Sequence, residues 1–368
     1  MSDRRSSIIN KAAYRAWKWW PSIRYAYRPR KPILFFRLVK GLFQTRVLRQ
    51  IRLRYVDLAL DFACNMHCEH CFATALKPDN TSKVHRMSIK DYRRVAKEAM
   101  AIGALNFSFQ GGEPILIQNL SEYITTVSPR RNVISVTTNG SLLTAEKIRI
   151  LKKQGVDILT ISVDSAIPEE HDHFRNYPGA FDKAMKAIHE ALSQGLHVTI
   201  GTTLSHDNLH SKGISDLVSF AEVNKIILCF AFATPIGNWA HHDDKLLTED
   251  DVAWVRGMEK RYMYIRTDFE ANLYSSGCGA VKEILYITPY GDVLPCPFIH
   301  ISLGNVMKEP LGVIRNRALR VREFAHYAPK CLCAEDQYFI QKYIKSTGSK
   351  GLLDGFEIFG WDKPGQYM

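Results

Sequence analysis

The sequence of 368 residues contains no run of about 18 uninterrupted apolar residues, so we expect no membrane-spanning helix. It also lacks a secretory signal pattern, because its first 20 residues, MSDRRSSIINKAAYRAWKWW, include charges but neither an apolar core nor a small-residue cleavage site. No internal repeat or low-complexity tract is present, and the hydrophobic fraction of 46% is typical of a large globular core. We therefore expect a cytoplasmic protein whose eight cysteines stay reduced, where clustered thiols more often bind metal than form disulfides.

Acidic residues are almost absent from the first 55 positions, which hold 15 Lys and Arg against Asp3 alone. This gives the segment a net charge of +14, whereas the rest of the chain has a net charge of −2. The same segment is rich in bulky apolar residues, some at helical spacing: Trp17, Trp19, Trp20, Phe35, Leu38, Val39, Leu42 and Phe43. A basic helix packed on the main domain, an anionic lipid surface and a nucleic acid are the alternatives. Lipid is favoured over nucleic acid, because phosphate binding does not need so much apolar surface.

From about residue 53 the sequence alternates between short apolar runs and amphipathic segments. The expected strands are 55–62, 105–110, 133–138, 157–164, 197–204 and 226–233. The expected helices are 88–103, 117–127, 144–154, 180–194 and 211–223, with Ser88 as an N-cap and Gly103 as a C-terminal stop for the first. Connections of this length make parallel crossovers, so we predict an α/β fold with a parallel sheet covered by helices, doubly wound or a partial barrel.

The unusual residues follow the predicted strands, where parallel α/β proteins place their chemistry. Three cysteines follow the first strand in the stretch DFACNMHCEHCF, at residues 61–72. GGEP (111–114), NG (139–140) and SVDS (162–165) follow or end the next three. Four consecutive strand ends with such residues indicate one site.

The spacing of Cys64, Cys68 and Cys71 lets three thiolates converge on one centre. A cubane iron–sulfur cluster takes one thiolate per iron, so three cysteines leave one iron open to another ligand. A structural zinc site that uses His67 or His70 as the fourth ligand is the alternative. The Gly-Gly-acid loop argues against zinc, and we expect both histidines to be loop residues.

The two motifs together, the three cysteines followed by aromatic Phe72 and then Gly111-Gly112-Glu113-Pro114, resemble those of the radical S-adenosylmethionine (SAM) superfamily over about residues 53–235. The resemblance implies a partial (β/α)6 TIM-like barrel and a [4Fe-4S] cluster whose open iron binds the amino and carboxylate groups of SAM. It also implies reductive cleavage of SAM to a 5′-deoxyadenosyl radical, with a reductant such as flavodoxin or ferredoxin as partner.

The resemblance also implies roles for residues near SAM. Gly111 and Gly112 would allow close backbone approach, and Glu113 would accept a hydrogen bond from the SAM amino group. Phe72 would lie near the adenine and Asn139 near the cofactor. The remaining three positions are Ser162 and Asp164 near the ribose and Arg175 at the SAM carboxylate. Turn or cap chemistry is the alternative for Asn139, Ser162 and Asp164.

A second cysteine set resembles the SPASM and Twitch extensions of the superfamily, which hold auxiliary [4Fe-4S] clusters. Its members are Cys278, Cys296, Cys331 and Cys333, beside a predicted hairpin at 283–296 and a predicted helix at 309–325. Four cysteines suffice for one auxiliary cluster, although Cys331 and Cys333 are closer in sequence than the family pattern. Reduced structural cysteines are the alternative, and Cys229 in the sixth strand is expected to be a core residue.

These patterns predict four parts: a basic amphipathic extension (1–52), a radical SAM core (53–235), an auxiliary-cluster module (236–345) and a tail (346–368). The predicted function is a radical SAM enzyme, of oxidoreductase or radical bond-forming type, that abstracts hydrogen from a small-molecule or lipid-linked substrate. A peptide or protein maturase is the alternative within the class, and a noncatalytic iron–sulfur or zinc protein is the alternative of another class. The N-terminal extension is a candidate contact to the cytoplasmic face of a membrane.

Overall fold

The computed structural model describes residues 31–78, 85–268, 277–345 and 351–362. Its main sheet has nine strands in the order β7-β6-β5-β4-β3-β2-β1-β8-β9. The strands are β1 (Tyr55–Asp61), β2 (Asn106–Gly111), β3 (Val133–Thr138), β4 (Ile158–Ser162), β5 (His197–Leu204), β6 (Ile227–Phe232), β7 (Ile265–Thr267), β8 (Ile284–Ile287) and β9 (Val293–Leu294). All neighbours are parallel except β8 and β9, so helices must connect most of the strands.

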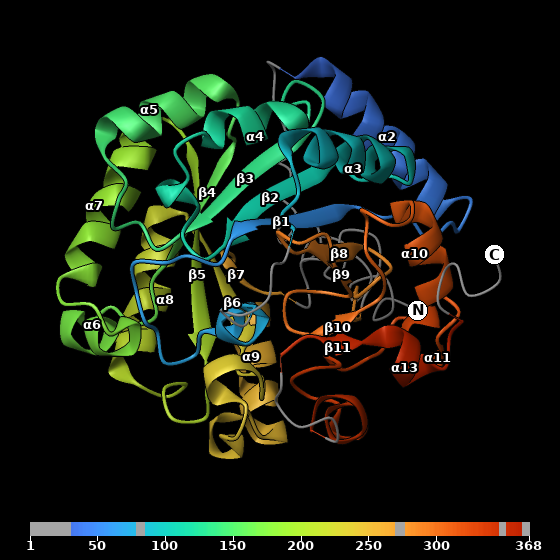
Figure 1. Cartoon of the computed structure of the whole chain (residues 1–368). Coiled ribbons are helices and arrows are strands. Elements are labelled where there is room, and N and C mark those ends of the chain that lie inside the picture. The colour runs from blue at the N-terminus through green and yellow to red at the C-terminus, as the bar shows by residue number, and fades with distance from the viewer. Residues whose placement is uncertain (1–30, 79–84, 269–276, 346–350, 363–368) are drawn as a thin grey trace, which may run out of the picture.

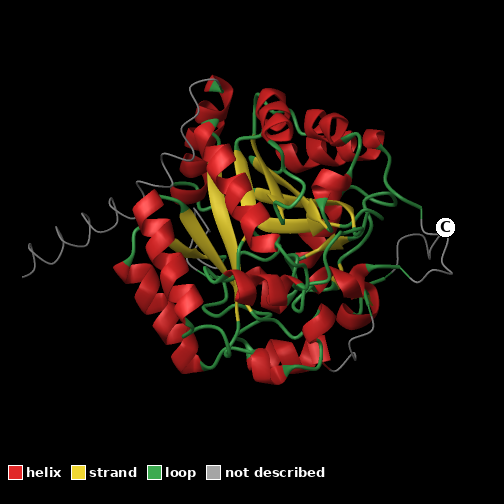
Figure 2. Ribbon diagram, turned by 90° about the vertical axis from the view of Figure 1, so that its left-hand side faces the viewer, coloured by secondary structure: helices red, strands yellow, loops and turns green. Residues whose placement is uncertain are grey.

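Most helices lie outside the curved sheet and cover its outer face, and those of the C-terminal segment lie to one side of it (Figures 1 and 2). They are α2 (Pro32–Arg46), α3 (Ile89–Ala101), α4 (Leu120–Thr126), α5 (Ala145–Gln154), α6 (Pro168–Arg175), α7 (Ala180–Ser193), α8 (Lys212–Asn224), α9 (Glu249–Arg261), α10 (Leu311–Ala318), α11 (Arg322–Ala325), α12 (Gln337–Phe339) and α13 (Gly355–Phe359). The two ends of α3 show which local interactions begin and end a helix. Ser88 and Asp91 form a capping box, and Gly103 just beyond the helix has φ +121°. Both residues therefore act as the sequence predicts.

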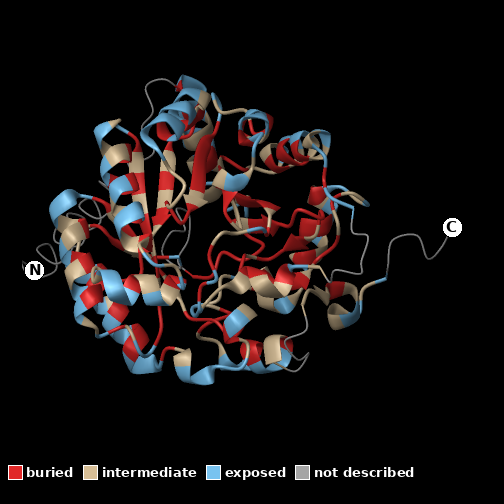
Figure 3. Cartoon of the chain, turned by 60° about the vertical axis from the view of Figure 1, so that its left-hand side comes forward, coloured by how far each residue is buried: buried red, intermediate tan, exposed pale blue. Residues whose placement is uncertain are grey.

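Each strand has an outer face under the helices and an inner face toward the interior of the curved sheet. In β5 the residues at 198, 200, 202 and 204 are buried, whereas His197, Thr199, Gly201 and Thr203 are half-buried. The large apolar core lies between the outer face and the helices, where buried side chains of strands and helices meet (Figure 3). The inner face is largely polar, in contrast to the apolar outer face.

The α/β fold with a TIM-like parallel sheet is confirmed, with six predicted strands in the predicted order. The structure adds α6, α9 and the short strand β7, which the sequence analysis did not predict. The predicted hairpin is present as β8 and β9, but β8 also pairs in parallel with β1 and so extends the main sheet. The predicted helix at 309–325 is wrong as a single element. The backbone turns extended at Val321, which separates α10 from α11.

The described part of the N-terminal extension is helix α2, which is held against the main domain by two basic side chains. Lys31 donates to the carbonyl oxygen of Asn132 over 2.9 Å and forms an ion pair with Asp157. Arg37 donates to the carbonyl oxygens of Arg131 and Ala104 over 2.9 and 2.8 Å. The tryptophans that the sequence analysis included in the lipid prediction, at positions 17, 19 and 20, lie outside the described residues. Among those that are described, no helix has the length and hydropathy that crossing a membrane requires.

Candidate metal centres and cofactor site

The carboxyl ends of β1 to β4 bring the predicted site residues to one edge of the sheet. The cysteine loop follows β1 and contacts the loops that follow the next strands. Gly112 donates its N–H to the carbonyl oxygen of Asp61 over 2.8 Å, and Glu113 donates to that of Ala63 over 2.9 Å. Asn139, after β3, donates its side-chain N–H to Asn65 over 3.0 Å. The strand-end residues therefore form one connected site.

The three cysteines of this loop lie together. Cys64, Cys68 and Cys71 share a small cluster with Met66, and Cys71 donates its N–H to the carbonyl oxygen of Cys68 over 3.3 Å. Burial raises the pKa of the Cys64 and Cys71 thiols, and the neighbouring thiolates raise it further. Thiolates so placed need a compensating cation, and iron held by all three would provide it.

The two glycines are required by close contact between the loops. A Cβ on Gly111 would lie 2.4 Å from the carbonyl oxygen of Asp61, and φ is +124° there. A Cβ on Gly112 would lie 2.0 Å from the carbonyl oxygen of Ala63. Only glycine fits such approaches. The pair therefore locks the second loop onto the cysteine loop, and its predicted approach to SAM stays a prediction.

Glu113 is buried, with 2% of its surface exposed. Its carboxylate accepts hydrogen bonds from Ile115 N–H (2.9 Å), the Thr138 hydroxyl (2.7 Å) and Asn139 N–H (2.8 Å). Burial raises its pKa, and these three donors act in the opposite direction. Its main visible role is to hold the loops after β2 and β3 together, and the predicted contact with the SAM amino group stays a prediction.

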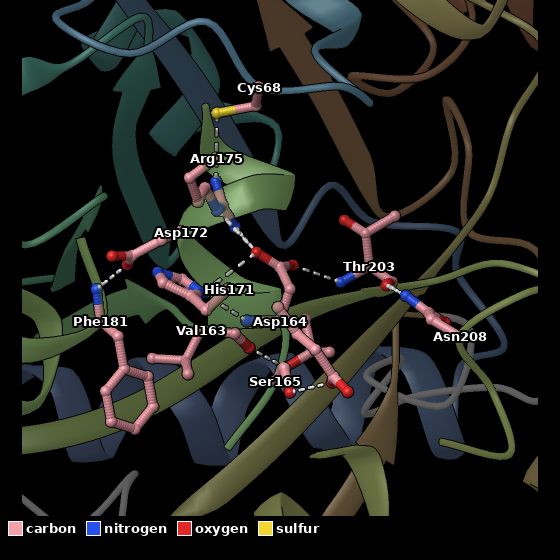
Figure 4. A network of polar contacts seen from close by, with 12 residues as sticks. Cys68, Val163, Asp164, Ser165, His171, Asp172, Arg175, Phe181, Thr203 and Asn208 are labelled. Atoms are coloured by element: carbon pink, nitrogen blue, oxygen red, sulfur yellow. Dashed lines mark hydrogen bonds and ion pairs between the residues drawn. The ribbon is translucent and has the colours of Figure 1, made fainter. Parts of the chain in front are cut away.

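Arg175 and Asp164 form a buried ion pair beside the cysteine loop (Figure 4). Arg175 Nε lies 2.6 Å from the Asp164 carboxylate, and its Nη1 lies 3.7 Å from Cys68 Sγ. His171 Nδ1 accepts a hydrogen bond from Asp164 N–H over 3.1 Å, and Asp164 also accepts one from Thr203 N–H over 3.1 Å. Burial opposes the charge of Asp164, but Arg175 holds its pKa below the usual value. The pair therefore places the Arg175 guanidinium beside the Cys68 sulfur, and the predicted contact of Arg175 with the SAM carboxylate stays a prediction.

The other predicted residues near the cofactor contact different parts of the chain. Phe72 packs edge-on against Phe298 and Tyr286, with ring centroids 5.4 and 6.2 Å apart, so it joins the cysteine loop to the C-terminal module. Ser162 ends β4 on its inner face and is half-buried. Asn139 Nδ2 lies 4.0 Å from Cys64 Sγ.

The two histidines of the cysteine loop differ in environment. His67 is exposed, whereas the ring of His70 stacks on Phe174 at a centroid distance of 4.7 Å. Burial lowers the pKa of His70 to about 4, so it is neutral near pH 7. Within the described residues, no three or more His, Cys, Asp or Glu side chains converge as tightly as one metal ion requires.

The second cysteine set gathers beside the hairpin β8–β9. Cys331 and Cys333 have their sulfurs 3.6 Å apart. Burial and the charges of Cys331 and Cys296 raise the pKa of Cys278, and hydrogen bonding with Cys296 and Cys331 raises that of Cys333. Four thiols that influence one another in this way suit one four-iron cluster, one thiolate per iron.

The polar inner face of the sheet was not predicted. Its side chains include Tyr55, Asp57, Ser108, Ser135, Thr137, Thr160, Thr199, Thr203 and Cys229. Cys229, predicted as a core residue, lies there with its sulfur 3.2 Å from Asp268. A small recess is lined by Asp268 together with Cys331, Cys333 and Phe298. The charge of Asp57 and the alternation of Ser and Thr with apolar residues in the other strands were the signals in the sequence that could have indicated this face.

The comparisons with known proteins agree with this arrangement. Residues 62–218 match the family described as the radical SAM superfamily, and residues 278–335 match the SPASM iron–sulfur cluster-binding domain. The chain is 30% identical to a GTP 3′,8-cyclase of Clostridium perfringens over 70% of this chain and 80% of that protein. It is 24% identical to an AdoMet-dependent heme synthase of Nitratidesulfovibrio vulgaris (73% and 81% covered). Identity to the subtilosin biosynthesis protein AlbA of Bacillus subtilis is 26% (81% and 68% covered).

Solved structures share the fold. Streptococcus suis SuiB bound to its precursor peptide SuiA matches with a TM-score of 0.58 and 17% identity, covering 78% of this chain and 69% of that one. The enzyme anSMEcpe with bound AdoMet matches with a TM-score of 0.54 and 17% identity, covering 74% and 82%.

Proposed function

The chain belongs to the radical SAM superfamily and carries a SPASM iron–sulfur domain, and from this premise we propose that it abstracts hydrogen from a polar small-molecule or lipid-linked substrate. When bound, a four-iron cluster with SAM on its open iron supplies the 5′-deoxyadenosyl radical for this step. Cys64, Cys68 and Cys71 would hold that cluster. The net reaction would be an oxidation or a bond formation, with a flavodoxin or ferredoxin as electron donor.

The polar inner face of the sheet carries the proposal. It lies between the two cysteine sets, since Phe72 of the first contacts Tyr286 on the inner face and the recess beside Asp268 reaches the second. Hydroxyl and carboxylate groups there suit a substrate with polar groups to orient. The strands and helices around it exclude bulk water, which protects a reactive intermediate.

Helix α2 supports the lipid-linked form of this proposal, and we place it on an anionic membrane surface. The helix buries Leu34 against the domain but leaves Phe35, Phe36 and Phe43 between 52% and 69% exposed. Exposed Lys40 lies on the same helix. Exposed aromatic and basic side chains on one helix are typical of helices that lie in the lipid interface.

A peptide or protein maturase is the second candidate. It is favoured by the similarity to AlbA, a bacteriocin biosynthesis protein, and by the shared fold with SuiB, which was solved with a precursor peptide. Peptides also offer polar groups to the inner face of the sheet.

One experiment tests both candidates. The full chain is reconstituted with iron and sulfide without oxygen, then given SAM and dithionite, and 5′-deoxyadenosine is measured. We expect formation of 5′-deoxyadenosine, and a further rise when a polar-lipid or small-metabolite fraction is added. A rise with the peptide fraction alone would favour the maturase. A Cys64→Ala, Cys68→Ala, Cys71→Ala variant is the control, and equal product from this variant would overturn the proposal.

A further inference from the structure

Four polar side chains lie side by side on the inner face of the sheet. The strand register pairs Asp57 of β1 with Tyr286 of β8 on one side and with Ser108 of β2 on the other. Ser108 in turn pairs with Ser135 of β3. Paired residues of neighbouring parallel strands point to the same side of a sheet, so these four side chains lie beside one another.

Tyr286, one of these four residues, has a buried hydroxyl that has no hydrogen-bond partner among the described residues. Its side chain is fully buried, with 0% exposed, and its Oη forms no hydrogen bond with any described residue. The adjacent charge of Asp57 adds to burial in raising the pKa of this hydroxyl. A buried hydroxyl normally has a partner, because an unmade hydrogen bond there costs about 1–3 kcal/mol. The missing partner indicates a ligand atom.

Asp57 is buried, with 3% of its surface exposed, whereas the carboxylate of Asp268, just after β7, is exposed. Burial and the charge of Asp268 both raise the pKa of Asp57, while the hydroxyls of Tyr55 and Ser108 act in the opposite direction. Asp268 itself lies 3.2 Å from Cys229 Sγ. Within the described residues, no Lys, Arg or His forms an ion pair with Asp57 or Asp268. The two carboxylates therefore influence each other, and no cation among the described residues balances them.

These groups lie between the two cysteine sets. Tyr286 contacts Phe72, the residue that follows Cys71, with ring centroids 6.2 Å apart. Asp268 lines the recess that Cys331 and Cys333 also line. A ligand held by Tyr286, Asp57 and Asp268 would thus lie between the two cysteine sets.

We propose that Asp57, Asp268 and Tyr286, here called the acidic row, bind a positively charged nitrogen group of the substrate, which makes the substrate an amine. The proposal rests on the proposed function, since it concerns the substrate of that same site. An ammonium group has three N–H donors, and the row offers two carboxylates and a hydroxyl oxygen as acceptors. Hydrogen bonds between charged groups are short and strong, so a buried amine would be oriented as well as held.

A cation would also remove the electrostatic cost of the row. The buried Asp57 carboxylate, with the charge of Asp268 acting on it, is costly to keep ionised without a nearby cation, and a ligand ammonium supplies one. A neutral or anionic substrate would leave this cost in place. The row therefore selects by charge, which is the strongest discrimination that a buried site can make.

Binding to the reconstituted full chain with SAM tests the proposal, measured by calorimetry with three probes of equal carbon number. The probes are 1,4-diaminobutane, 1,4-butanediol and succinate. We expect the diamine to bind, the diol to bind at least tenfold more weakly and succinate not to bind. Asp57→Asn should weaken diamine binding at least tenfold, and Tyr286→Phe should weaken it less. The exposed Asp250→Asn on α9 is the matched control and should bind the diamine as the unchanged protein does.

Diamine affinity that is unchanged in Asp57→Asn, binding of the diol as tight as that of the diamine, or no diamine binding at all would overturn the acidic row. Thermal unfolding without a probe shows whether Asp57→Asn is folded, so that weaker binding is not caused by unfolding. Asp57→Asn removes an uncompensated buried carboxylate, so it should fold and unfold at an equal or higher temperature. SAM cleavage by the unchanged protein without a probe reports the proposed function separately. If the protein cleaves SAM but does not bind the diamine, only the acidic row is wrong. If it cleaves no SAM, the proposed function is wrong.

Discussion

At the scale of single residues, Glu113 has two candidate roles, which are to hold two loops together and to contact SAM. Its carboxylate accepts three hydrogen bonds, so in Glu113→Gln the amide NH2 would face at least one of these N–H donors in either orientation. We expect Glu113→Gln to lower the free energy of unfolding by about 1–3 kcal/mol and to weaken SAM binding through displacement of Asn139. Urea unfolding of the iron-free protein and SAM binding to the reconstituted protein are the measurements.

The exposed Glu146→Gln on α5 is the matched control for this change and should alter neither quantity. Weaker SAM binding together with unchanged stability would contradict the bracing role. It would instead support the direct contact of Glu113 with the SAM amino group that the family resemblance implies.

His171 makes stability depend on pH. Burial lowers its pKa to about 4, below the value of about 6.5 expected in an unfolded chain, so the unfolded chain binds more protons between these values. Stability is therefore expected to fall as pH falls from 6.5 toward 4, by at most about 3 kcal/mol from this residue. His171→Asn keeps an acceptor for Asp164 N–H and removes the titration. Urea unfolding of the iron-free variant at pH 7 and pH 5 should show a smaller difference than the unchanged protein.

The exposed His173→Asn on the same helix should keep the full pH dependence. An equal pH dependence in His171→Asn and the unchanged protein would show that His171 is charged in the folded state.

At the scale of elements, the cysteine loop and the hairpin module are expected to hold separate clusters. The unchanged protein should bind about eight irons per chain, four in each set. Replacing Cys64, Cys68 and Cys71 by Ala should leave about four irons and no SAM cleavage. Replacing Cys278, Cys296, Cys331 and Cys333 by Ala should also leave about four irons, with SAM cleavage retained. Iron and zinc analysis with 5′-deoxyadenosine assay measures this, and stoichiometric zinc in place of iron would contradict it.

The elements also show how far the sequence could predict the site. Strand ends carry Cys64, Gly111, Asn139 and Asp164 because chemistry gathers there in parallel sheets, and local periodicity finds those ends. The position of β8 could not be predicted, since four residues pair with β1 across more than 200 positions and no local pattern fixes that register. Without this register nothing in the sequence places Tyr286 beside Asp57, and the polar inner face was missed.

At the scale of the whole molecule, the sequence predicted a basic extension but not its attachment. Charge and apolar spacing within the first 55 residues are visible in the sequence. The ion pair of Lys31 with Asp157 and the hydrogen bonds of Arg37 join α2 to residues about 100 positions away. Contacts of this kind depend on the assembled fold. They hold α2 firmly, so its exposed side is a fixed surface rather than a loose segment.

The attached helix makes the membrane prediction specific. Phe35, Phe36 and Phe43 are more than half exposed on α2, and each such side chain contributes about 1.5–3 kcal/mol when buried in lipid. Basic residues near an anionic surface add about 1 kcal/mol each, less at high salt. We therefore expect the full chain to float with liposomes that contain anionic lipid and to be released by salt. Phe35→Ser, Phe36→Ser, Phe43→Ser should weaken binding at least tenfold. Val223→Ser, at an 80% exposed position on α8, should not. Equal flotation of all three proteins, or none by the unchanged chain, would assign α2 to another partner and leave the substrate free of any link to lipid.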